Sequence, residues 1–459
     1  MLYYFSGVIG LKKDIHINIP SGAEYIIKKL EQAGFEAFVV GGCVRDSIIG
    51  RSPQDWDIAV SAKPEEVKRI FQRTIDTGLQ HGTVTILHEG IPYEATTYRI
   101  DGEYIDNRKP EWVAFTSSIK EDLSRRDFTI NAMAYNPSQG LVDPFDGVRD
   151  IQQRQIKAVG KAEGRFQEDA LRMLRAVRFH AQLGYQIEPV TFEAIRQHVK
   201  LIGNISKERI REELTKALLA DPMSFVLFQK SGILQEVLPE LNRCFNIPQN
   251  NPYHIYNVGL HILRAAKQIE STVLLRWVML LHDLGKADTL STDDKGINHF
   301  HGHQQRSAEL AEEILKRLRF DNATIQQARR LILEHDRQVA DTEKSVRKAM
   351  AAIGPDLFDK WLQIRQADMS AQNPEWLSER LNGLKRIEEL YKKVVAEQQC
   401  ITLKDLKVSG KELMDIGFSP GKELGEALRT LLEAVIEEPA LNQKETLLEM
   451  AKKYLREQL

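Results

Sequence analysis

The sequence contains little cysteine and almost no net charge. Only three of its 459 residues are cysteines, at positions 43, 244 and 400. Their wide separation excludes a disulfide framework and the paired spacing of a structural zinc site, and it is typical of a protein from a reducing, cytoplasmic compartment. The formal net charge is −2. A global basic field is therefore excluded, and any contact with nucleic acid requires a local basic patch.

Long apolar runs, internal repeats and low-complexity segments are also lacking. The first twenty residues contain a short apolar run that is too short to cross a membrane, and no charged region precedes it. We therefore expect no membrane partner, and we interpret residues 1–20 as an extension ahead of the fold. The chain is 42% hydrophobic and 28% charged, which is typical of a globular protein of several domains.

The most informative segment is FVVGGCVRDSIIGRSPQDWDIAVS, residues 38–61, which predicts a strand, a glycine turn, a short helix and a second strand. Gly41 and Gly42 allow the backbone to turn or to approach a ligand closely. Asp55 and Asp57 share one face of the second strand because side chains alternate along a strand. Neighbouring carboxylates repel each other unless a cation lies between them, and Mg²⁺ is commonly held by carboxylates and substrate phosphates. The combination indicates phosphoryl or nucleotidyl transfer, although D-x-D alone is usually an ordinary strand end.

The string GGCVRDSIIGRSPQDWDIAVS resembles the signature of the class II tRNA nucleotidyltransferases and their bacterial poly(A) polymerase relatives. This resemblance implies an α+β head, similar to the DNA polymerase beta nucleotidyltransferase fold, followed by an all-α neck, body and tail. It implies that Asp55 and Asp57 bind Mg²⁺ and bring the RNA 3′-hydroxyl to the α-phosphorus. It also implies that Gly41, Gly42 and Arg45 position the triphosphate.

Periodicity predicts that the head is a compact sheet with helices on one face. We expect helices over 21–33 and 64–73, and strands over 35–40, 82–87 and 91–99. Glu94 lies on the last of these strands. It is either a third carboxylate that faces the Asp55–Asp57 pair or a surface residue, and the sequence leaves both alternatives open.

Two segments follow that the resemblance makes informative. Residues 101–120 are polar and predict a flexible loop. In the family, such a loop is linked to addition of the final A. Its presence here argues against an enzyme that adds only C. Residues 124–135, SRRDFTINAMAY, predict a charged start and an apolar helix. Their resemblance to the second family motif implies that Arg125 and Arg126 bind a triphosphate or ribose, with Asp127 also in the nucleotide site, because guanidinium pairs with phosphate in a fixed fork.

Residues 165–183, RFQEDALRMLRAVRFHAQL, predict one helix with Glu168 and Asp169 in its first turn. Asp169 and Arg172 are three residues apart and share a face, which is most often an ordinary helical ion pair. A carboxylate and a guanidinium can also imitate a base edge. The stretch resembles the EDxxR motif of the family, which implies that Asp169 and Arg172 select C or A, with Glu168 in support. The same motif adds two nucleotide-binding candidates, Arg175 and Arg178.

Seven of the 12 histidines lie between residues 254 and 335. Within this region LLHDLGK, residues 280–286, predicts an apolar helix that ends at a His-Asp pair, with a loop from Gly285. Imidazole and carboxylate are ligands of divalent transition metals, and the region resembles an HD domain, a helical metal-dependent phosphohydrolase fold. The implied ligands for Ni²⁺, Co²⁺, Mn²⁺ or Zn²⁺ are His261, His282, Asp283 and His303, with His335 as a further candidate. The alternative is a relic HD fold that no longer binds metal.

These segments predict a chain of several parts. We expect an extension at 1–20, a nucleotidyltransferase head at 21–147, a neck for nucleotide selection and RNA binding at 148–205, body helices at 206–250, an HD domain at 251–345 and a helical, tRNA-binding tail at 346–459. Lys and Arg outnumber Asp and Glu between residues 148 and 216, which fits contacts with a tRNA backbone but equally fits a solvated helical surface.

The resemblance implies a Mg²⁺-dependent tRNA nucleotidyltransferase that adds C and A to the tRNA 3′ end from CTP and ATP without a nucleic-acid template. Its expected partners are tRNA, ATP and CTP, and not DNA. Three alternatives remain: an A-only enzyme that works with a separate CC-adding enzyme, a poly(A) polymerase, and an HD phosphohydrolase whose head binds RNA. The sequence leaves the oligomeric state open, a homo-oligomer included.

Overall fold

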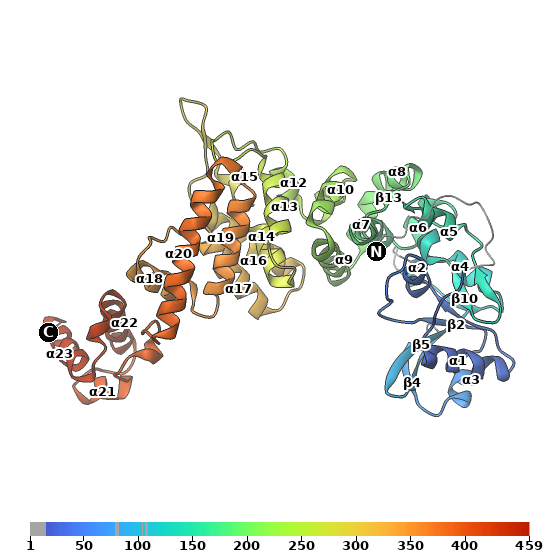
Figure 1. Cartoon of the computed structure of the whole chain (residues 1–459), viewed down its shortest axis with the longest axis horizontal. Helices are drawn as coiled ribbons and strands as arrows, with labels where there is room; N and C mark the ends of the chain where they lie inside the picture. Colours follow the sequence, from blue (N-terminus) through green and yellow to red (C-terminus); the bar gives the residue numbers. More distant parts are fainter. Residues whose placement is uncertain (1–14, 79–81, 103, 106–108, 459) are drawn as a thin grey trace. The chain divides into compact units, whose positions relative to one another are not determined.

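The computed structural model describes residues 15–78, 82–102, 104–105 and 109–458 (Figure 1). The chain divides into two compact units, Met1–Val237 and Leu238–Leu459. Of the expected extension, residues 1–14 lie outside the described part, and residues 15–20 form no helix or strand before α1 (Ser21–Gln32) begins. Among the described residues, every helix is too short or too polar to cross a membrane.

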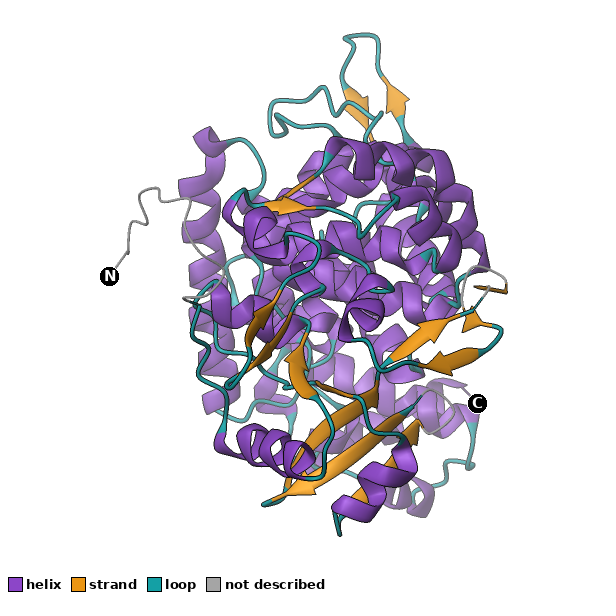
Figure 2. Cartoon of the chain, turned by 90° about the vertical axis from the view of Figure 1, so that its right-hand side faces the viewer, coloured by secondary structure: helices purple, strands orange, loops and turns teal. Residues whose placement is uncertain are grey.

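A seven-stranded mixed sheet forms the base of the first unit, with the order β11-β10-β1-β2-β5-β4-β3; its strands are orange in Figure 2. The central strand β1 runs antiparallel to β2 and β10, whereas β2 runs parallel to β5. The strands are β1 (Ala37–Val40), β2 (Ile58–Val60), β3 (Thr74–Gly78), β4 (Thr83–His88), β5 (Ile91–Thr97), β10 (Ala134–Asn136) and β11 (Gly140–Val142).

Apolar residues explain why these strands lie at the centre. All four residues of β1 and all three of β2 are buried, as expected for strands that are covered on both faces. Helix α1 packs against β1, and α3 (Pro64–Ile70) packs against β4. The short α2 (Gly42–Ile48) follows the glycine turn directly. The predicted α+β head, with helices on the sheet, is confirmed.

The prediction of an apolar helix within residues 124–135 is wrong. The described chain forms α4 (Ile119–Ser124), a single 3₁₀ turn η2 (Thr129–Asn131) and then strand β10. All three residues of β10 are buried and it pairs with β1, so its sequence lacks the alternation that distinguishes a strand from a buried helix. Strands β3, β10 and β11 were not predicted.

The expected loop at 101–120 contains paired strands in its described part. Strand β6 (Arg99–Asp101) pairs with β9 (Val113–Phe115), and β7 (Tyr104–Ile105) pairs with β8 (Lys109–Pro110). Residue 103 and residues 106–108, at the centre of that prediction, lie outside the described part.

The single helix expected over 165–183 is two helices. Helix α6 (Ala162–Glu168) ends at Asp169, whose backbone is extended (φ −135°, ψ 104°), and α7 begins at Leu171 and ends at Leu183. Asp169 is therefore not in the first turn of a helix; it lies in the break between two. The remaining elements of this unit are α5 (Gly147–Gln152), β12 (Gln155–Ile156), β13 (Gln186–Ile187), α8 (Pro189–His198), α9 (Lys207–Ala220), α10 (Phe225–Lys230) and α11 (Ile233–Val237).

The second unit is almost entirely helical, which confirms the expected all-α region. Its helices are α12 (Pro239–Cys244), α13 (Val258–Gln268), α14 (Val273–Leu281), α15 (Lys286–Thr289), α16 (His303–Arg317), α17 (Asn322–Glu334), α18 (Glu343–Ile353), α19 (Phe358–Ser370), α20 (Leu377–Ala396), α21 (Gly410–Asp415), α22 (Lys422–Glu437) and α23 (Lys444–Gln458). A two-stranded hairpin, β14 (Ser291–Thr292) with β15 (Asn298–His299), interrupts them. Gly285 and Lys286 were expected to open a loop, but they begin the short helix α15.

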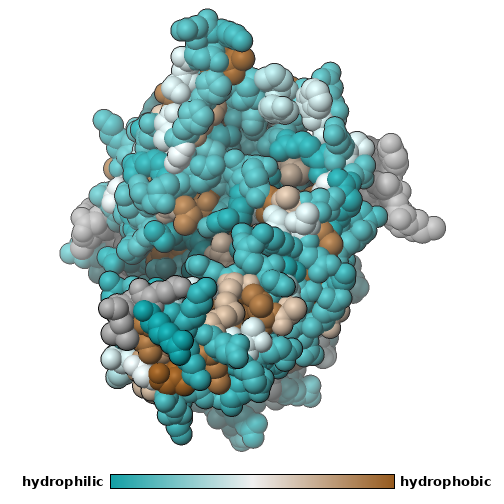
Figure 3. Space-filling model, turned by 90° about the vertical axis from the view of Figure 1, so that its left-hand side faces the viewer, coloured by the Kyte–Doolittle hydropathy of each residue, from teal (hydrophilic) through white to brown (hydrophobic). Residues whose placement is uncertain are grey.

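Two groups of helices pack together in this unit. Helices α13, α14, α16, α17 and α19 contact one another. The C-terminal helices enclose a separate apolar cluster that includes Leu413, Val435 and Leu447. The surface in Figure 3 is largely hydrophilic with small, separate hydrophobic patches, as expected for a globular surface.

Candidate active site and candidate metal cluster

A cavity of about 650 Å³ in the first unit brings together the residues that the head and neck motifs predict. Eight Arg or Lys residues and four Asp residues line it, so it suits a polyanionic ligand. The predicted residues on its wall are Gly41, Gly42, Arg45, Asp55, Asp57, Arg125, Arg126, Asp127, Asp169, Arg172, Arg175 and Arg178. Glu94 is the one predicted head residue that is not on this wall.

The glycine turn requires glycine at its first position. Gly41 has φ +79°, and a Cβ there would lie 2.8 Å from Nη1 of Arg126. A side chain would therefore be strained and would also press on Arg126. Gly42 has room for a Cβ, whose nearest neighbour would be Arg45 at 3.7 Å. At Gly41, the positive φ and the nearby Arg126 side chain together leave no space for a side chain.

Glu94 lies beside Asp57. Strand β2 pairs in parallel with β5, with Ile58 opposite Ala95, and Asp57 and Glu94 are the residues directly before these two. Burial raises the pKa of Asp57, the carboxylates of Glu94 and Asp55 raise it further, and Arg126 lowers it. Three neighbouring carboxylates, two of which raise the pKa of the third, fit a divalent cation with oxygen ligands. Glu94 is also an exposed strand residue off the cavity wall, so both readings of Glu94 stay open and its part in the chemistry stays a prediction.

Arg125 and Arg126 share one buried partner that the sequence analysis missed. Asp122 lies 2.8 Å from Nη2 of Arg125 and 3.3 Å from Nη2 of Arg126. Burial opposes the ionisation of Asp122, but the two arginines outweigh it and lower its pKa. The two guanidinium groups at the cavity wall are therefore held by one carboxylate behind them.

Asp127 is held inside a polar network. It accepts hydrogen bonds from Nε of Arg175 at 2.7 Å and from Nδ2 of Asn131 at 3.1 Å. The Oδ1 of Asn131 in turn accepts a hydrogen bond from Arg45. Burial opposes the ionisation of Asp127, but Arg175 and Asn131 outweigh it and lower its pKa to about 2. Asp127 thus connects the glycine-turn helix to α7.

Asp169 and Arg172 both reach the cavity, but each pairs with another residue. Asp169 accepts from Nη2 of Arg209 at 2.8 Å and from Nη1 at 3.4 Å. Arg172 donates to Oε2 of Glu168 at 2.6 Å and to the backbone carbonyl of Arg125 at 2.8 Å. The carboxylate and the guanidinium are thus held by separate partners, although both line the same cavity.

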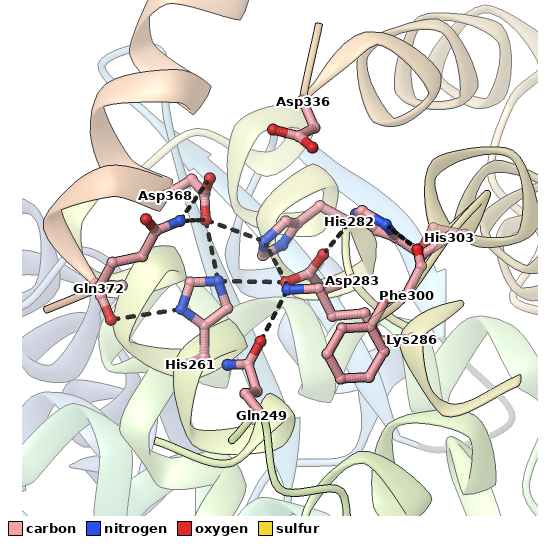
Figure 4. A network of polar contacts seen from close by, with 12 residues as sticks. Gln249, His261, His282, Asp283, Lys286, Phe300, His303, Asp336, Asp368 and Gln372 are labelled. Carbon is pink, nitrogen blue, oxygen red and sulfur yellow. Dashed lines mark hydrogen bonds and ion pairs between the residues drawn. The ribbon is translucent and has the colours of Figure 1, made fainter. Parts of the chain in front are cut away.

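In the second unit, the histidines and the carboxylate predicted for the HD site converge, and Figure 4 shows His261, His282 and His303 around Asp283. Oδ2 of Asp283 lies 3.3 Å from Nε2 of His261 and 3.3 Å from Nε2 of His282. Oδ1 lies 3.4 Å from Nε2 of His303 and 3.6 Å from Nε2 of His335. All five residues are at least nine-tenths buried. The five predicted candidates thus form one cluster.

The four imidazoles are oriented by the backbone. Nδ1 of each lies close to a carbonyl oxygen: His282 to Met279 at 2.8 Å, His303 to Phe300 at 2.8 Å, His335 to Ile332 at 2.7 Å and His261 to Ala371 at 3.4 Å. A carbonyl can only accept, so each Nδ1 carries the proton and each Nε2 faces the cluster. This arrangement is typical of histidines that bind a metal.

Asp368 on α19 completes the cluster and was missed by the sequence analysis. Its Oδ1 lies 3.0 Å from Nε2 of His261 and 3.7 Å from Nε2 of His282. Lys286, also buried, places Nζ 2.7 Å from Oδ2 of Asp283 and 2.9 Å from Oε1 of Gln249. Burial opposes protonation of His282, but Asp283 and Asp368 outweigh it and raise the pKa of His282 to about 10. Positive charge therefore stabilises this group of carboxylates and imidazoles. A metal ion that bound there would replace the additional proton on His282.

Known proteins resemble the chain along most of its length. A model described as "Poly A polymerase head domain" matches residues 37–157, one described as "Probable RNA and SrmB- binding site of polymerase A" matches 184–245, and one described as "tRNA nucleotidyltransferase domain 2 putative" matches 289–451. A CCA-adding enzyme of Lactobacillus johnsonii is 50% identical over 214 residues, so the chain spans about half (54%) of that relative. A CCA-adding enzyme of Limosilactobacillus fermentum is 36% identical over 438 residues, which cover 95% of this chain and 97% of the relative.

The chain belongs to the family of the CCA-adding enzymes.

The family assignment agrees with a solved structure. The CCA-adding enzyme of Bacillus stearothermophilus, determined in complex with CTP, superimposes with a TM-score of 0.70 at 29% identity and covers 95% of this chain and 98% of its own. A CCA-adding enzyme of Thermotoga maritima complexed with tRNA shares the fold at 20% identity and a TM-score of 0.55. The predicted class II nucleotidyltransferase resemblance is confirmed.

Some site residues of this family member carry a signal that the sequence analysis did not use. Asp122 stands three and four residues before its two arginines, which is ion-pair spacing on a helix. Arg209 and Lys216 of α9 both line the cavity, and their separation of seven residues places them on one helix face. Asp368 has no histidine close to it in sequence, and only the fold of α19 brings it to the cluster.

Proposed function

We propose that this chain is a tRNA nucleotidyltransferase that adds C and A to the 3′ end of tRNA from CTP and ATP. The observation that carries the proposal is the single cavity in the first unit, where a D-x-D pair, a glycine turn, eight cationic side chains and the Asp169–Arg172 pair face the same space. Each of these parts alone is common, but together they provide every group that the reaction requires. The CCA-adding enzymes among its relatives support the same reading.

The basic wall would hold the nucleotide's triphosphate. Arg45, Arg125 and Arg126 line the cavity, and Asp122 and Asn131 behind them fix their positions. At Gly41 the backbone itself forms the wall, so its polar groups can approach a phosphate closely. Guanidinium groups held in place by carboxylates lose little conformational entropy when they bind an anion. Asp127 acts in this proposal as a positioning residue.

Asp55 and Asp57 would hold Mg²⁺, with Glu94 beside them. The mutual effect of these carboxylates on the pKa of Asp57 fits a cation between them. A bound Mg²⁺ ion would neutralise charge on the triphosphate and polarise its phosphorus. The 3′-hydroxyl of the RNA releases its proton to solvent as its oxygen forms a bond to the α-phosphorus, the bond from that phosphorus to the bridging oxygen breaks, and pyrophosphate leaves.

Asp169 and Arg172 would select the base. The Asp169 carboxylate accepts from the exocyclic amino group that cytosine and adenine share, and the Arg172 guanidinium donates to ring nitrogen or carbonyl oxygen. Uracil and guanine present a carbonyl oxygen where cytosine and adenine present the amino group, and two acceptors, that oxygen and the Asp169 carboxylate, share no hydrogen bond. Arg175 and Arg178 lie on α7 beyond this pair and line the same cavity.

The rest of the chain would bind tRNA. The proposed division is a head at 21–147, a neck at 148–205, body helices at 206–250, an HD region at 251–345 and a tail at 346–459. We place the activity in the cytoplasm, because the three cysteines are free and buried and tRNA is the proposed substrate.

Addition assays on defined tRNA ends test this function. Transcripts that end before CCA, after C and after CC are each offered CTP, ATP or both. The proposal expects C addition to the first two and A addition to the third, and full CCA when both nucleotides are present. Addition of A to the third transcript alone would identify an A-only enzyme, and extension by many A residues would identify a poly(A) polymerase. Both results would contradict the proposal.

We also propose that the HD region hydrolyses phosphate esters. The observation that favours this second function is the buried cluster of imidazoles whose Nε2 atoms face two carboxylates. Such a donor set fits Ni²⁺, Co²⁺, Mn²⁺ or Zn²⁺ better than Mg²⁺. A bound ion of this kind would generate a hydroxide nucleophile at neutral pH. Cyclic and terminal phosphates at damaged tRNA ends are the proposed substrates, because their removal exposes hydroxyl groups for nucleotide addition.

A further inference from the structure

The cavity of the first unit contains two kinds of cationic side chain, those with and those without a carboxylate partner. All seven arginines on its wall lie within 3.3 Å of a carboxylate oxygen. Part of the field of each guanidinium is therefore cancelled before any ligand binds. The pairs are Arg45 with Asp46, Arg125 and Arg126 with Asp122, Arg172 with Glu168, Arg175 with Asp127, Arg178 with Glu213 and Arg209 with Asp169.

Lys216 is the remaining cation among the described residues of that wall, and its surroundings differ. Its side chain is exposed and forms no ion pair or hydrogen bond with the part of the chain that the structure describes. An ammonium group is a compact point charge, and without a neighbouring carboxylate it keeps its full attraction for an incoming anion. Lys216 can therefore bind an anion without breaking a contact within the described chain.

Helix α9 holds Lys216 at a defined distance from the residues proposed to select the base. Arg209, Glu213 and Lys216 are four and three residues apart, so they share one face of the helix. Arg209 pairs with Asp169. Glu213 pairs with Arg178 of α7, so two ion pairs fix this face of α9. Lys216 lies about 10 Å beyond Arg209 along the helix axis. It therefore meets a different part of the substrates from the base that Asp169 contacts.

Phosphate is the anionic group that both substrates of the proposed reaction carry, the nucleotide in its triphosphate and the RNA in its backbone. Arg45, Arg172 and Arg178, which are assigned to the nucleotide, are buried, as expected around an enclosed ligand. Lys216 is exposed. An RNA strand that brings its 3′ end into the cavity keeps its backbone towards solvent. The exposure of Lys216 therefore favours the RNA as the source of its phosphate.

We propose that Lys216 binds a backbone phosphate close to the 3′ end of the RNA. Nζ of Lys216 forms a salt bridge to a phosphate oxygen and displaces a counterion from the RNA. A contact of this kind positions the strand without reading its sequence. It therefore suits an RNA end whose last base changes with each added nucleotide. This inference rests on the proposed addition of C and A to tRNA.

RNA binding at several salt concentrations tests the proposal. The full-length wild type and Lys216→Gln are each bound to a labelled tRNA transcript that ends in CC, and ATP binding is measured separately. Lys216→Gln should weaken RNA binding roughly tenfold at low salt. The slope of log affinity against log salt should become shallower by about one. The affinity for ATP should be unchanged.

Two further variants control for effects other than charge. Lys216→Arg keeps the cation and should retain the RNA affinity and the salt slope of the wild type. Lys207→Gln is the matched control, because Lys207 lies on the same helix but not on the cavity wall; it should also behave as the wild type.

A neutral linkage in the RNA identifies the phosphate. A methylphosphonate replaces each of the last few phosphates in turn, which removes one negative charge at a time. At one linkage it should weaken binding to the wild type and cause no further loss in Lys216→Gln, as expected for two groups in contact.

The outcomes separate this inference from the proposed function. Wild-type RNA affinity in Lys216→Gln, or additive losses at every linkage, would overturn the inference and leave the proposed function intact. A loss of affinity for ATP alone would also overturn it, and would assign Lys216 to the triphosphate. A wild-type chain that adds no nucleotide to the same transcript would instead contradict the proposed function.

Discussion

Both terminal nitrogens of Arg209, on α9, donate hydrogen bonds to the carboxylate of Asp169, at 2.8 Å and 3.4 Å. Asp169 lies in the break between α6 and α7, where the backbone is extended, and its Oδ1 accepts a hydrogen bond from the backbone N–H of Leu171 at 3.0 Å. Helix α9 packs against α7, so Arg209 adds a second restraint on the Asp169 carboxylate from a separate element. We infer that Arg209 is a positioning residue for base selection.

Replacing Arg209 should loosen base choice. Arg209→Lys keeps the charge but loses the two-pronged geometry, so we expect UTP and GTP to compete better with CTP and ATP while kcat for the correct nucleotide changes little. Single-nucleotide incorporation with each of the four triphosphates measures this. Arg211→Ala is the control, since Arg211 lies on the same helix but not on the cavity wall. Equal effects of the two variants on selectivity would refute the positioning role.

Asp169→Ala and Arg172→Ala should impair selection more than chemistry. Loss of one bidentate base contact should cost about 1–3 kcal/mol of discrimination, which is roughly a 5- to 150-fold loss of selectivity. The measured quantity is the ratio of kcat/KM for CTP and ATP to that for UTP and GTP. If both variants retained the wild-type ratio, the base would be selected elsewhere.

Asp127→Asn should destabilise the first unit in a pH-dependent way. The pKa of Asp127 is lowered to about 2 in the folded chain, so its ionised form stabilises the fold above about pH 4. This contribution, about 2 kcal/mol, disappears as the pH falls from about 4 to about 2. Thermal unfolding of wild type and variant between pH 7 and pH 3 should show a difference in midpoint that is constant near neutrality and narrows at the acid end.

Asp76→Asn is the control for Asp127. Asp76 pairs with Lys68 on the surface, and such a pair contributes about 0–1 kcal/mol. If Asp127→Asn lowered the stability of the fold at pH 7 by as little as Asp76→Asn, the role assigned to the buried network would be contradicted. A loss of stability that grew as the pH fell would also contradict it.

The two proposed activities should be separable. His282→Gln with Asp283→Asn should remove hydrolysis of 2′,3′-cyclic and terminal phosphates in the presence of Ni²⁺ or Mn²⁺ and leave nucleotide addition unchanged, because the cluster and the head cavity belong to different units. Asp57→Asn should retain the hydrolysis. A wild-type chain that hydrolyses nothing with Ni²⁺, Co²⁺, Mn²⁺ or Zn²⁺ would show that the HD region is structural.

The sequence predicts those parts of the candidate sites whose residues are close together along the chain. The glycine turn at Gly41 and the Asp55–Asp57 pair are contiguous, and strand alternation is enough to relate them. The break at Asp169 was not predictable in this way, since the helical periodicity of its neighbours continues through it. Strand β10 lacks the apolar–polar alternation of a half-buried strand, because all three of its residues are buried.

Partners that come from distant segments were the other omission. Arg209 is 40 residues from Asp169, and Asp368 is more than 80 residues from the histidine-aspartate motif it joins. Only the packing of α9 on α7 and of α19 on α13 brings these side chains to their sites. Local motifs thus located both sites, whereas tertiary packing determined which side chains orient them.

The most direct test of the account is single-turnover addition of A by Asp57→Asn to a tRNA that ends in CC, with ATP and millimolar Mg²⁺. Removing one carboxylate of the proposed Mg²⁺ site should abolish addition while ATP still binds, because the basic wall and the Asp169–Arg172 pair are unchanged. The folded state should be at least as stable as wild type, since the repulsion around Asp57 is relieved. Addition at the wild-type rate by this variant would contradict the claim that the cavity of the first unit performs the transfer.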